Sequence, residues 1–230
     1  MTPALQVVRP AGPLHRVGRV PDAWALAPWT YAGPDNTFGN RYDDPQGEYR
    51  VLYAAAQRRG AFMETLARFR PDVHLIAELQ AIEDDETFPT LPPAVVPREW
   101  LETRCVGEAS ATSLDFADIS HSESLAHLRH HLAARLVHYG LDDLDAGDIR
   151  KRTPRALTQE VSRYVFERAE SEDGEPVDGI RYRSRLGDEL ENWGIFEGSE
   201  LDEILEEAEP IEAGDPDFVS ALTTLGLTLS

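Results

Sequence analysis

The chain has 230 residues, of which 42 are Asp or Glu and 22 are Lys or Arg, so its formal net charge is −20. This acidity argues against non-specific nucleic-acid binding and against docking on an anionic membrane, because both need a basic surface. The length suffices for one sizeable core. We therefore expect a single domain, 1–230, with an acidic loop at about 83–97 and an acidic C-terminal segment at about 199–214.

Cysteine usage and hydropathy bear on the compartment. The single cysteine, Cys105, excludes an internal disulfide and is typical of a reducing environment. No apolar run approaches the roughly 18 residues that a membrane-spanning helix needs, and residues 1–20 lack the apolar core of a signal peptide. These features predict a cytoplasmic protein that does not associate with a membrane.

In the first half of the chain, turn-rich loops are expected to alternate with short strands. A strand at 15–20 is followed by a proline-rich segment with three aromatic residues at 21–37, which either caps the core or covers a ligand pocket. Next come an apolar strand at 49–54 and a helix at 61–69, separated at Gly60 and ended by Pro71. Further strands are expected at 73–79, 103–108 and 113–116.

The second half begins with the clearest helix, predicted at 123–139. Ser120 and Glu123 fit a capping box, and Gly140 fits the position after the last turn. Pro154 starts another helix that runs to about 170, a turn follows at 171–174, and strands are expected at 177–185 and 193–197. A solvated helix or loop at 203–209 and a short helix at 215–225 complete an α+β chain. We expect a compact mixed β core flanked by helices.

Three histidines fall on the face of the 123–139 helix opposite its leucines. His127 and His131 have the spacing of zinc ligands, but Leu128 stands where the HExxH motif has its glutamate, and no nearby carboxylate is an obvious third ligand. We interpret this face as solvated and expect no metal. The chain also has no GxGxxG or P-loop pattern, so Rossmann or Walker nucleotide binding is not expected.

Two blocks of the sequence carry a family resemblance. The first is a loop, strand and helix, with Gly39-Asn40-Arg41-Tyr42, then Gly47, Tyr53 and, eleven residues later, Glu64. The second is the late strand Asp178-Gly179-Ile180-Arg181-Tyr182-Arg183-Ser184-Arg185. In this order the blocks resemble the RES-domain family, the toxins of bacterial RES–Xre toxin–antitoxin pairs, which is named for an Arg, a Glu and a Ser. The match implies that Arg41, Glu64 and Ser184 are these three residues.

The resemblance implies a fold similar to that of ADP-ribosyltransferases and an enzyme that consumes NAD. Related toxins degrade NAD by hydrolysis or phosphorolysis, and a cognate antitoxin occludes their site. The implied partner is therefore an Xre-type helix-turn-helix antitoxin, with NAD as the substrate and no metal.

The chemistry of NAD cleavage suits these residue types. Breaking the nicotinamide–ribose bond builds positive charge on the ribose, which a fixed carboxylate such as Glu64 stabilises more in the transition state than in the substrate. A guanidinium holds a pyrophosphate with forked hydrogen bonds, a role that suits Arg41 and, as weaker candidates, Arg16 or Arg19. Tyr53 and Tyr42 could stack on nicotinamide or bind the ribose, and Ser184 could orient a ribose hydroxyl or Glu64.

Three functions remain open from the sequence. The first is an NAD glycohydrolase or phosphorylase toxin. The second is an ADP-ribosyltransferase that modifies a macromolecule, which uses the same cleavage with a different acceptor. The third is a catalytically silent binding module whose acidic segment binds a basic partner, and this one predicts no NAD loss and no effect of Glu64→Ala.

Overall fold

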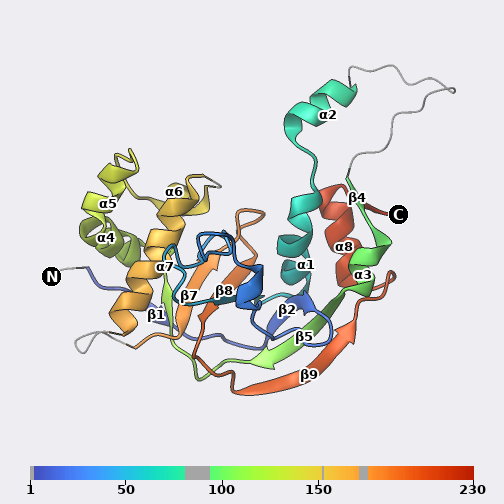
Figure 1. The fold of residues 1–230 in the computed structure, drawn as a ribbon, viewed down its shortest axis with the longest axis horizontal. Helices are drawn as coiled ribbons and strands as arrows, with labels where there is room; N and C mark the ends of the chain where they lie inside the picture. Colours follow the sequence, from blue (N-terminus) through green and yellow to red (C-terminus); the bar gives the residue numbers. More distant parts are fainter. Residues whose placement is uncertain (1–2, 81–93, 152, 171–175) are drawn as a thin grey trace.

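The computed structural model describes residues 3–80, 94–151, 153–170 and 176–230. These residues form a mixed α+β structure in which helices flank a central sheet, as predicted (Figure 1). The eight-stranded sheet has the order β1-β6-β7-β8-β3-β2-β5-β9, with β6 and β7 parallel and the other neighbours antiparallel. Its strands are β1 Val7–Val8, β2 Leu14–Arg19, β3 Val51–Ala55, β5 Arg104–Ser110, β6 Phe116–Asp118, β7 Gly179–Arg183, β8 Glu191–Phe196 and β9 Glu203–Pro210. A separate parallel pair joins β4 (Val95–Val96) to β10 (Thr228–Leu229).

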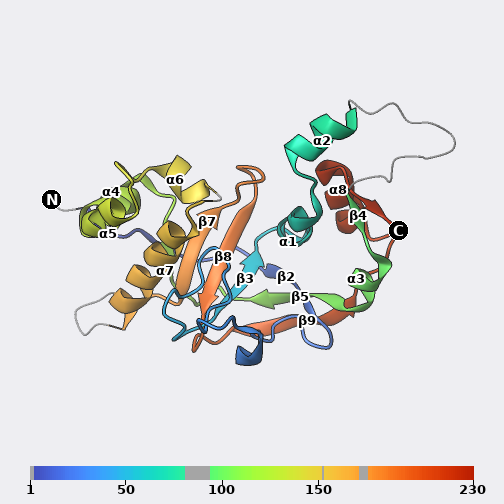
Figure 2. The ribbon, with the colours of Figure 1, turned by 45° about the horizontal axis from the view of Figure 1, so that its top comes forward.

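The helices gather in two groups at the two ends of the sheet, and α2 projects away from the body (Figures 1 and 2). One group contains α4 (Ser122–His131), α5 (Ala133–His138), α6 (Ala146–Arg150) and α7 (Arg155–Ala169). The other contains α1 (Arg58–Leu66), α3 (Arg98–Glu102) and α8 (Pro216–Leu225). Helix α2 is Val73–Gln80, and two short 3₁₀ turns are η1 (Trp29–Tyr31) and η2 (Ala67–Phe69).

Each helix group has its own apolar core, and a third core lies on the other face of the sheet. Leu128 and Val161 belong to the first group's core, and Phe62 packs edge-on against Phe218 in the second, with ring centroids 5.7 Å apart. Because strand side chains alternate, Tyr53 of β3 faces the helices while Ala54 packs on the opposite face. The middle of the helix-covered face of the sheet therefore lies between the two helix groups, each of which packs around its own core.

Most expected elements are present, with small shifts at their ends. The strands expected at 15–20, 49–54, 103–108, 177–185 and 193–197 correspond to β2, β3, β5, β7 and β8, whereas the strand expected at 113–116 shares only Phe116 with β6. The helices expected at 61–69, from 154 to 170 and at 215–225 correspond to α1 with η2, α7 and α8. The alternation predicted for β7 is confirmed, because Ile180, Tyr182 and Ser184 are all buried.

The strand expected at 73–79 is wrong, because this segment is the helix α2. Asp72 starts it: its side chain accepts a 2.7 Å hydrogen bond from the His74 amide, and its carbonyl accepts one from the Ile76 amide. Such a cap satisfies amide groups that the first turn leaves unpaired. The apolar residues suited either structure, and the Pro71-Asp72 start was the signal that favoured a helix.

The solvated helix or loop expected at 203–209 is also wrong. This segment is β9, the edge strand, which pairs antiparallel with β5 through a bulge. Ile204 and Glu206 are exposed, and the acidic composition leaves the open edge charged, which disfavours pairing with other chains. Backbone pairing with β5 thus overrides the low strand propensity of glutamate.

The helix expected at 123–139 is divided at Leu132 into α4 and α5. The capping box of Ser120 and Glu123 is absent; instead the His121 side chain accepts a hydrogen bond from the Glu123 amide. His127, expected on a solvated face, is buried, with its ring nitrogens 2.8 Å from the Pro3 carbonyl and 2.8 Å from the Tyr164 hydroxyl. The N-terminal segment and α7 cover this face, which the periodicity of one helix could not indicate.

Some expectations lie outside the described residues, namely most of the acidic loop at 83–97 and the turn at 171–174. Within the described ranges, no helix is long and apolar enough to cross a membrane.

Candidate active site

Glu64 stands on α1 at the side of a cavity between the two helix groups. Helix α1 follows β3 directly, and its buried side chains Phe62, Met63 and Leu66 anchor it in the second core. Gly60 lies in the first turn of this helix, next to the Ala55 side chain at the end of β3. This anchoring leaves Glu64 half-buried, with its carboxylate in a narrow cavity of about 110 Å³.

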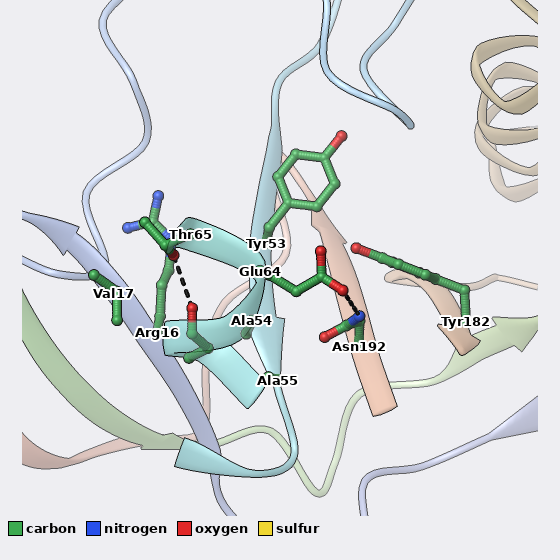
Figure 3. A pocket seen from close by; sticks show the side chains of 10 residues that line it. Arg16, Val17, Tyr53, Ala54, Ala55, Glu64, Thr65, Tyr182 and Asn192 are labelled. Carbon is green, nitrogen blue, oxygen red and sulfur yellow. Dashed lines mark hydrogen bonds between the residues drawn. The ribbon is translucent and has the colours of Figure 1, made fainter. Parts of the chain in front are cut away.

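Two side chains hold one oxygen of that carboxylate. The Ser184 hydroxyl donates a short hydrogen bond to Glu64 Oε1, and the Asn192 amide donates a second one of 2.9 Å to the same atom. The Leu186 amide donates to Ser184 Oγ over 2.9 Å, which directs the hydroxyl proton toward Glu64. Ser184 and Asn192 expose only 1% of their surface each, so both donors are buried. Figure 3 shows the bond from Asn192, on β8, to Glu64.

Tyrosines from β3 and β7 line the same cavity. Figure 3 shows Tyr182 pointing toward Glu64 and the Tyr53 hydroxyl pointing away from it. Burial raises the pKa of both phenols well above the usual value, helped at Tyr53 by the charge of Asp43 and at Tyr182 by that of Glu64. Both hydroxyls are therefore neutral at physiological pH, and an uncharged phenol can donate a hydrogen bond.

Tyr53 also holds the loop that presents Arg41. Its hydroxyl donates a 2.7 Å hydrogen bond to Asp43 and accepts one of 3.0 Å from the Tyr42 amide. The other Asp43 oxygen accepts from the Asn40 amide over 2.7 Å, and burial raises the pKa of Asp43. Tyr53 therefore supports this loop through its hydroxyl group and also lines the cavity.

Arg41 lines a wider cavity of about 420 Å³ that also contains Glu64. Its guanidinium donates to the Ile149 carbonyl and lies 5.2 Å and 5.8 Å from the ring centroids of Tyr42 and Tyr182. The Arg41 Nε is buried without a hydrogen-bond partner in the described structure, and no carboxylate there forms an ion pair with Arg41. The Arg41 guanidinium therefore lines the cavity without a carboxylate partner among the described residues.

The wider cavity is rich in arginine although the chain is acidic. Within the described ranges, Arg68, Arg70 and Arg155 also form no ion pair with a carboxylate. Such a group of cations concentrates positive potential over Glu64 and favours an anionic ligand. The arginines that line this cavity are Arg41, Arg68, Arg70, Arg155 and Arg185.

Arg16 of β2 lies on the other side of Glu64, beside Thr65 (Figure 3). Its guanidinium donates to the Ala23 carbonyl, and burial lowers the pKa of Arg16 to about 10. The group is still charged at neutral pH. The structure thus brings Arg16 and Arg41 to two adjoining cavities that share Glu64, and Ser184 donates to the Glu64 carboxylate from outside their linings.

Tyr42 is the predicted binding residue that does not reach a cavity. It is completely buried, and its ring packs against Tyr182 with centroids 4.5 Å apart. Burial raises the pKa of its phenol, whose oxygen has no hydrogen-bond partner among the described residues. Adjacent side chains point in different directions here: Arg41 lines the wide cavity, whereas Tyr42 is buried in the core.

Asn192 and Tyr182 were missed as site residues. Asn192 stands opposite Tyr182 in the β7–β8 pairing, so one cross-strand pair contributes both. A buried amide in an otherwise apolar strand was the signal available for Asn192, because buried polar groups need partners. For metals, the described residues contain no group of three or more His, Cys, Asp or Glu side chains that could hold an ion.

The described residues thus form a mixed sheet flanked by helices, with a glutamate held by two donors beside an arginine-lined cavity. The family model of the RES domain matches residues 13–216. The chain therefore belongs to the RES domain family, which is associated with toxin–antitoxin systems and with NAD-related activity. Neither a search of curated proteins nor a search of solved structures found a match to this chain.

Proposed function

We propose that this protein binds NAD and cleaves its nicotinamide–ribose bond, as an NAD glycohydrolase or phosphorylase toxin. The observation that carries the proposal is the Glu64 carboxylate, which two buried donors hold by one oxygen in a narrow cavity next to the arginine-lined one. Membership of the RES domain family supports the assignment to NAD.

In the proposed reaction the bond between ribose C1′ and the nicotinamide nitrogen breaks, and its electron pair leaves with nicotinamide. The ribose becomes positively charged, as in glycoside cleavage. Because Ser184 and Asn192 occupy Oε1, the other oxygen of Glu64 faces this charge and stabilises the transition state. Water or phosphate then adds to C1′ and releases a proton, giving ADP-ribose or its 1-phosphate.

The arginines supply the binding of the diphosphate. Arg41 is held by the loop that Tyr53 supports, so its planar group meets the ligand without reorganisation. The neutral hydroxyl of Tyr182 lies within the same cavity and is suited to donate to a ribose oxygen or to the nicotinamide amide.

We further propose that an Xre-type antitoxin neutralises the protein by placing a segment of its chain in this cavity. Support comes from the association of the family with toxin–antitoxin systems and from the positive lining, which favours a segment with carboxylates.

The test is the loss of NAD over time with purified protein, with and without phosphate, followed by nicotinamide release. Glu64→Gln keeps an oxygen that can accept from Ser184 and Asn192 but removes the charge. A unit charge about 4 Å from the ribose is worth about 4 kcal/mol near a protein surface, so kcat should fall about 10³-fold.

The matched control is Glu99→Gln, at an exposed glutamate of α3, which should keep full activity. Loss of NAD without phosphate identifies a hydrolase, and strong phosphate dependence identifies a phosphorylase. No NAD loss under either condition, or a Glu64→Gln variant as active as wild type, contradicts the proposal.

A further inference from the structure

A second chamber adjoins the Glu64 cavity on the side of β2. It encloses about 570 Å³, within the range of small-molecule sites. Thr65 lines this chamber and also both cavities around Glu64. The chamber shares Arg16 and Val17 with the narrow cavity, and it shares Asn40 with the wide cavity. The three spaces therefore adjoin one another around Thr65.

The lining of the chamber holds more cations than anions in the described part of the chain. Arg16, Arg19 and Arg104 line it, and within the described residues none of them forms an ion pair. The one carboxylate in its lining, Asp22, accepts a 2.7 Å hydrogen bond from the Trp24 amide. Burial lowers the pKa of Arg104, and the charge of Arg19 lowers it further, so these two cations stand near each other, and the charge of Asp22 offsets only part of the positive charge of the lining. An anionic group in the chamber would relieve this repulsion.

The rest of the chamber lining is mostly apolar and aromatic. The segment 20–28 contributes two prolines, Val20, Leu26 and alanines, and Tyr31 is 60% exposed at its end, with the Arg19 guanidinium 5.4 Å from its ring centroid. An aromatic ring with a guanidinium beside it, such as Tyr31 with Arg19, can stack on the flat face of a nucleobase. This part of the lining is firmly held: Trp24 is buried in the core, and Gly18 lies so close to Ala23 that a Cβ would be 2.4 Å from its carbonyl oxygen.

We propose that this chamber binds the adenosine-phosphate half of the dinucleotide, with phosphate beside Arg19 and Arg104 and the adenine against Tyr31 and the apolar segment. The inference rests on the proposed function, because it takes the Glu64 cavity as the place where the nicotinamide–ribose bond is cleaved. The two halves of the substrate are then recognised in separate chambers joined at Thr65. The protein consequently prefers a dinucleotide to nicotinamide mononucleotide, which has the same scissile bond but lacks the adenosine half.

The test compares kcat/KM for NAD and for nicotinamide mononucleotide in wild type and in Arg19→Gln. Arg19 is exposed, so the substitution leaves the fold intact. Removing one charged hydrogen bond should lower kcat/KM for NAD about tenfold and leave the value for the mononucleotide unchanged. The same substitution at Arg129, a 61% exposed side chain of α4 remote from the chamber, controls for the change in net charge and should alter neither value. Equal losses on both substrates, or no loss on NAD, overturn the proposal.

The failure of the proposed function can be told apart from the failure of this inference. If wild type cleaves neither compound, or cleaves the mononucleotide too slowly to measure, ADP-ribose is titrated calorimetrically into wild type, Arg19→Gln and Tyr31→Ala. Binding that both substitutions weaken supports the chamber even where catalysis is absent. Binding that is absent, or that neither substitution changes, overturns it.

Discussion

Removing Asn192 tests how the orientation of Glu64 contributes to turnover. The Asn192→Ala variant loses the 2.9 Å hydrogen bond to Glu64 Oε1 and leaves the Ser184 hydroxyl as a donor to that atom. A hydrogen bond to a charged group contributes about 1.5–3 kcal/mol. If this free energy serves to hold the carboxylate against the ribose charge, kcat falls about 10- to 100-fold while KM for NAD changes little.

The assay is the initial rate of nicotinamide release as a function of NAD concentration, for Asn192→Ala, Ser184→Ala and the double variant. Since both donors hold the same oxygen, their effects on the activation free energy should not add. Ser162→Ala is the matched control, because it removes a buried 3.1 Å hydrogen bond to Tyr49 away from the cavity. An Asn192→Ala variant with wild-type kcat, or an equal loss of kcat in Ser162→Ala, would refute the reasoning.

Three further predictions concern binding, packing and pH. Arg41→Lys keeps the charge but loses the planar fork, so KM for NAD in the same assay should rise about tenfold with less change in kcat; an unchanged KM contradicts it. Phe218→Ala removes a fully buried ring that packs on Phe62, so urea unfolding should show a loss of about 3–5 kcal/mol; a loss below about 1 kcal/mol means that α8 does not brace α1. Hydrogen bonds, that of Ser113 first, lower the pKa of Asp202 to about 2, so its contribution to stability is present above about pH 4 and lost as pH falls toward 2. Melting temperatures should therefore show Asp202→Asn below wild type at pH 6 and converging with it only as pH approaches 2, and a difference that does not depend on pH would contradict this assignment.

Local sequence signals predicted the elements that build the site. The apolar run of β3, the break at Gly60 and the apolar face of α1 were sufficient to place Tyr53 and Glu64 on a strand and the helix after it. The same signals failed at α2 and β9. At α2 the apolar residues suit either structure, and at β9 the pairing with β5 decides.

The family pattern names residues of the candidate site, but the direction of each side chain depends on packing, which the pattern does not contain. Arg41 and Tyr42 are neighbours in one motif, yet one lines the cavity and the other is buried in the core. His127 likewise lies under the N-terminal segment although helical periodicity placed it on an open face. Which face of an element is covered depends on segments remote in sequence, and periodicity does not contain that information.

The sequence by itself determined the fold class, the family and the loop, strand and helix that carry Arg41, Tyr53 and Glu64, because propensity, turns and motif spacing act over a few residues. Only the tertiary structure decided that Ser184 and Asn192, which are 120 and 128 residues from Glu64 along the chain, donate to the same carboxylate oxygen. Their meeting depends on the pairing of β7, β8 and β3 and on the packing of α1 over those strands. Strand register and helix packing are set by the whole core, and so the bracing of the glutamate is a property of the folded chain.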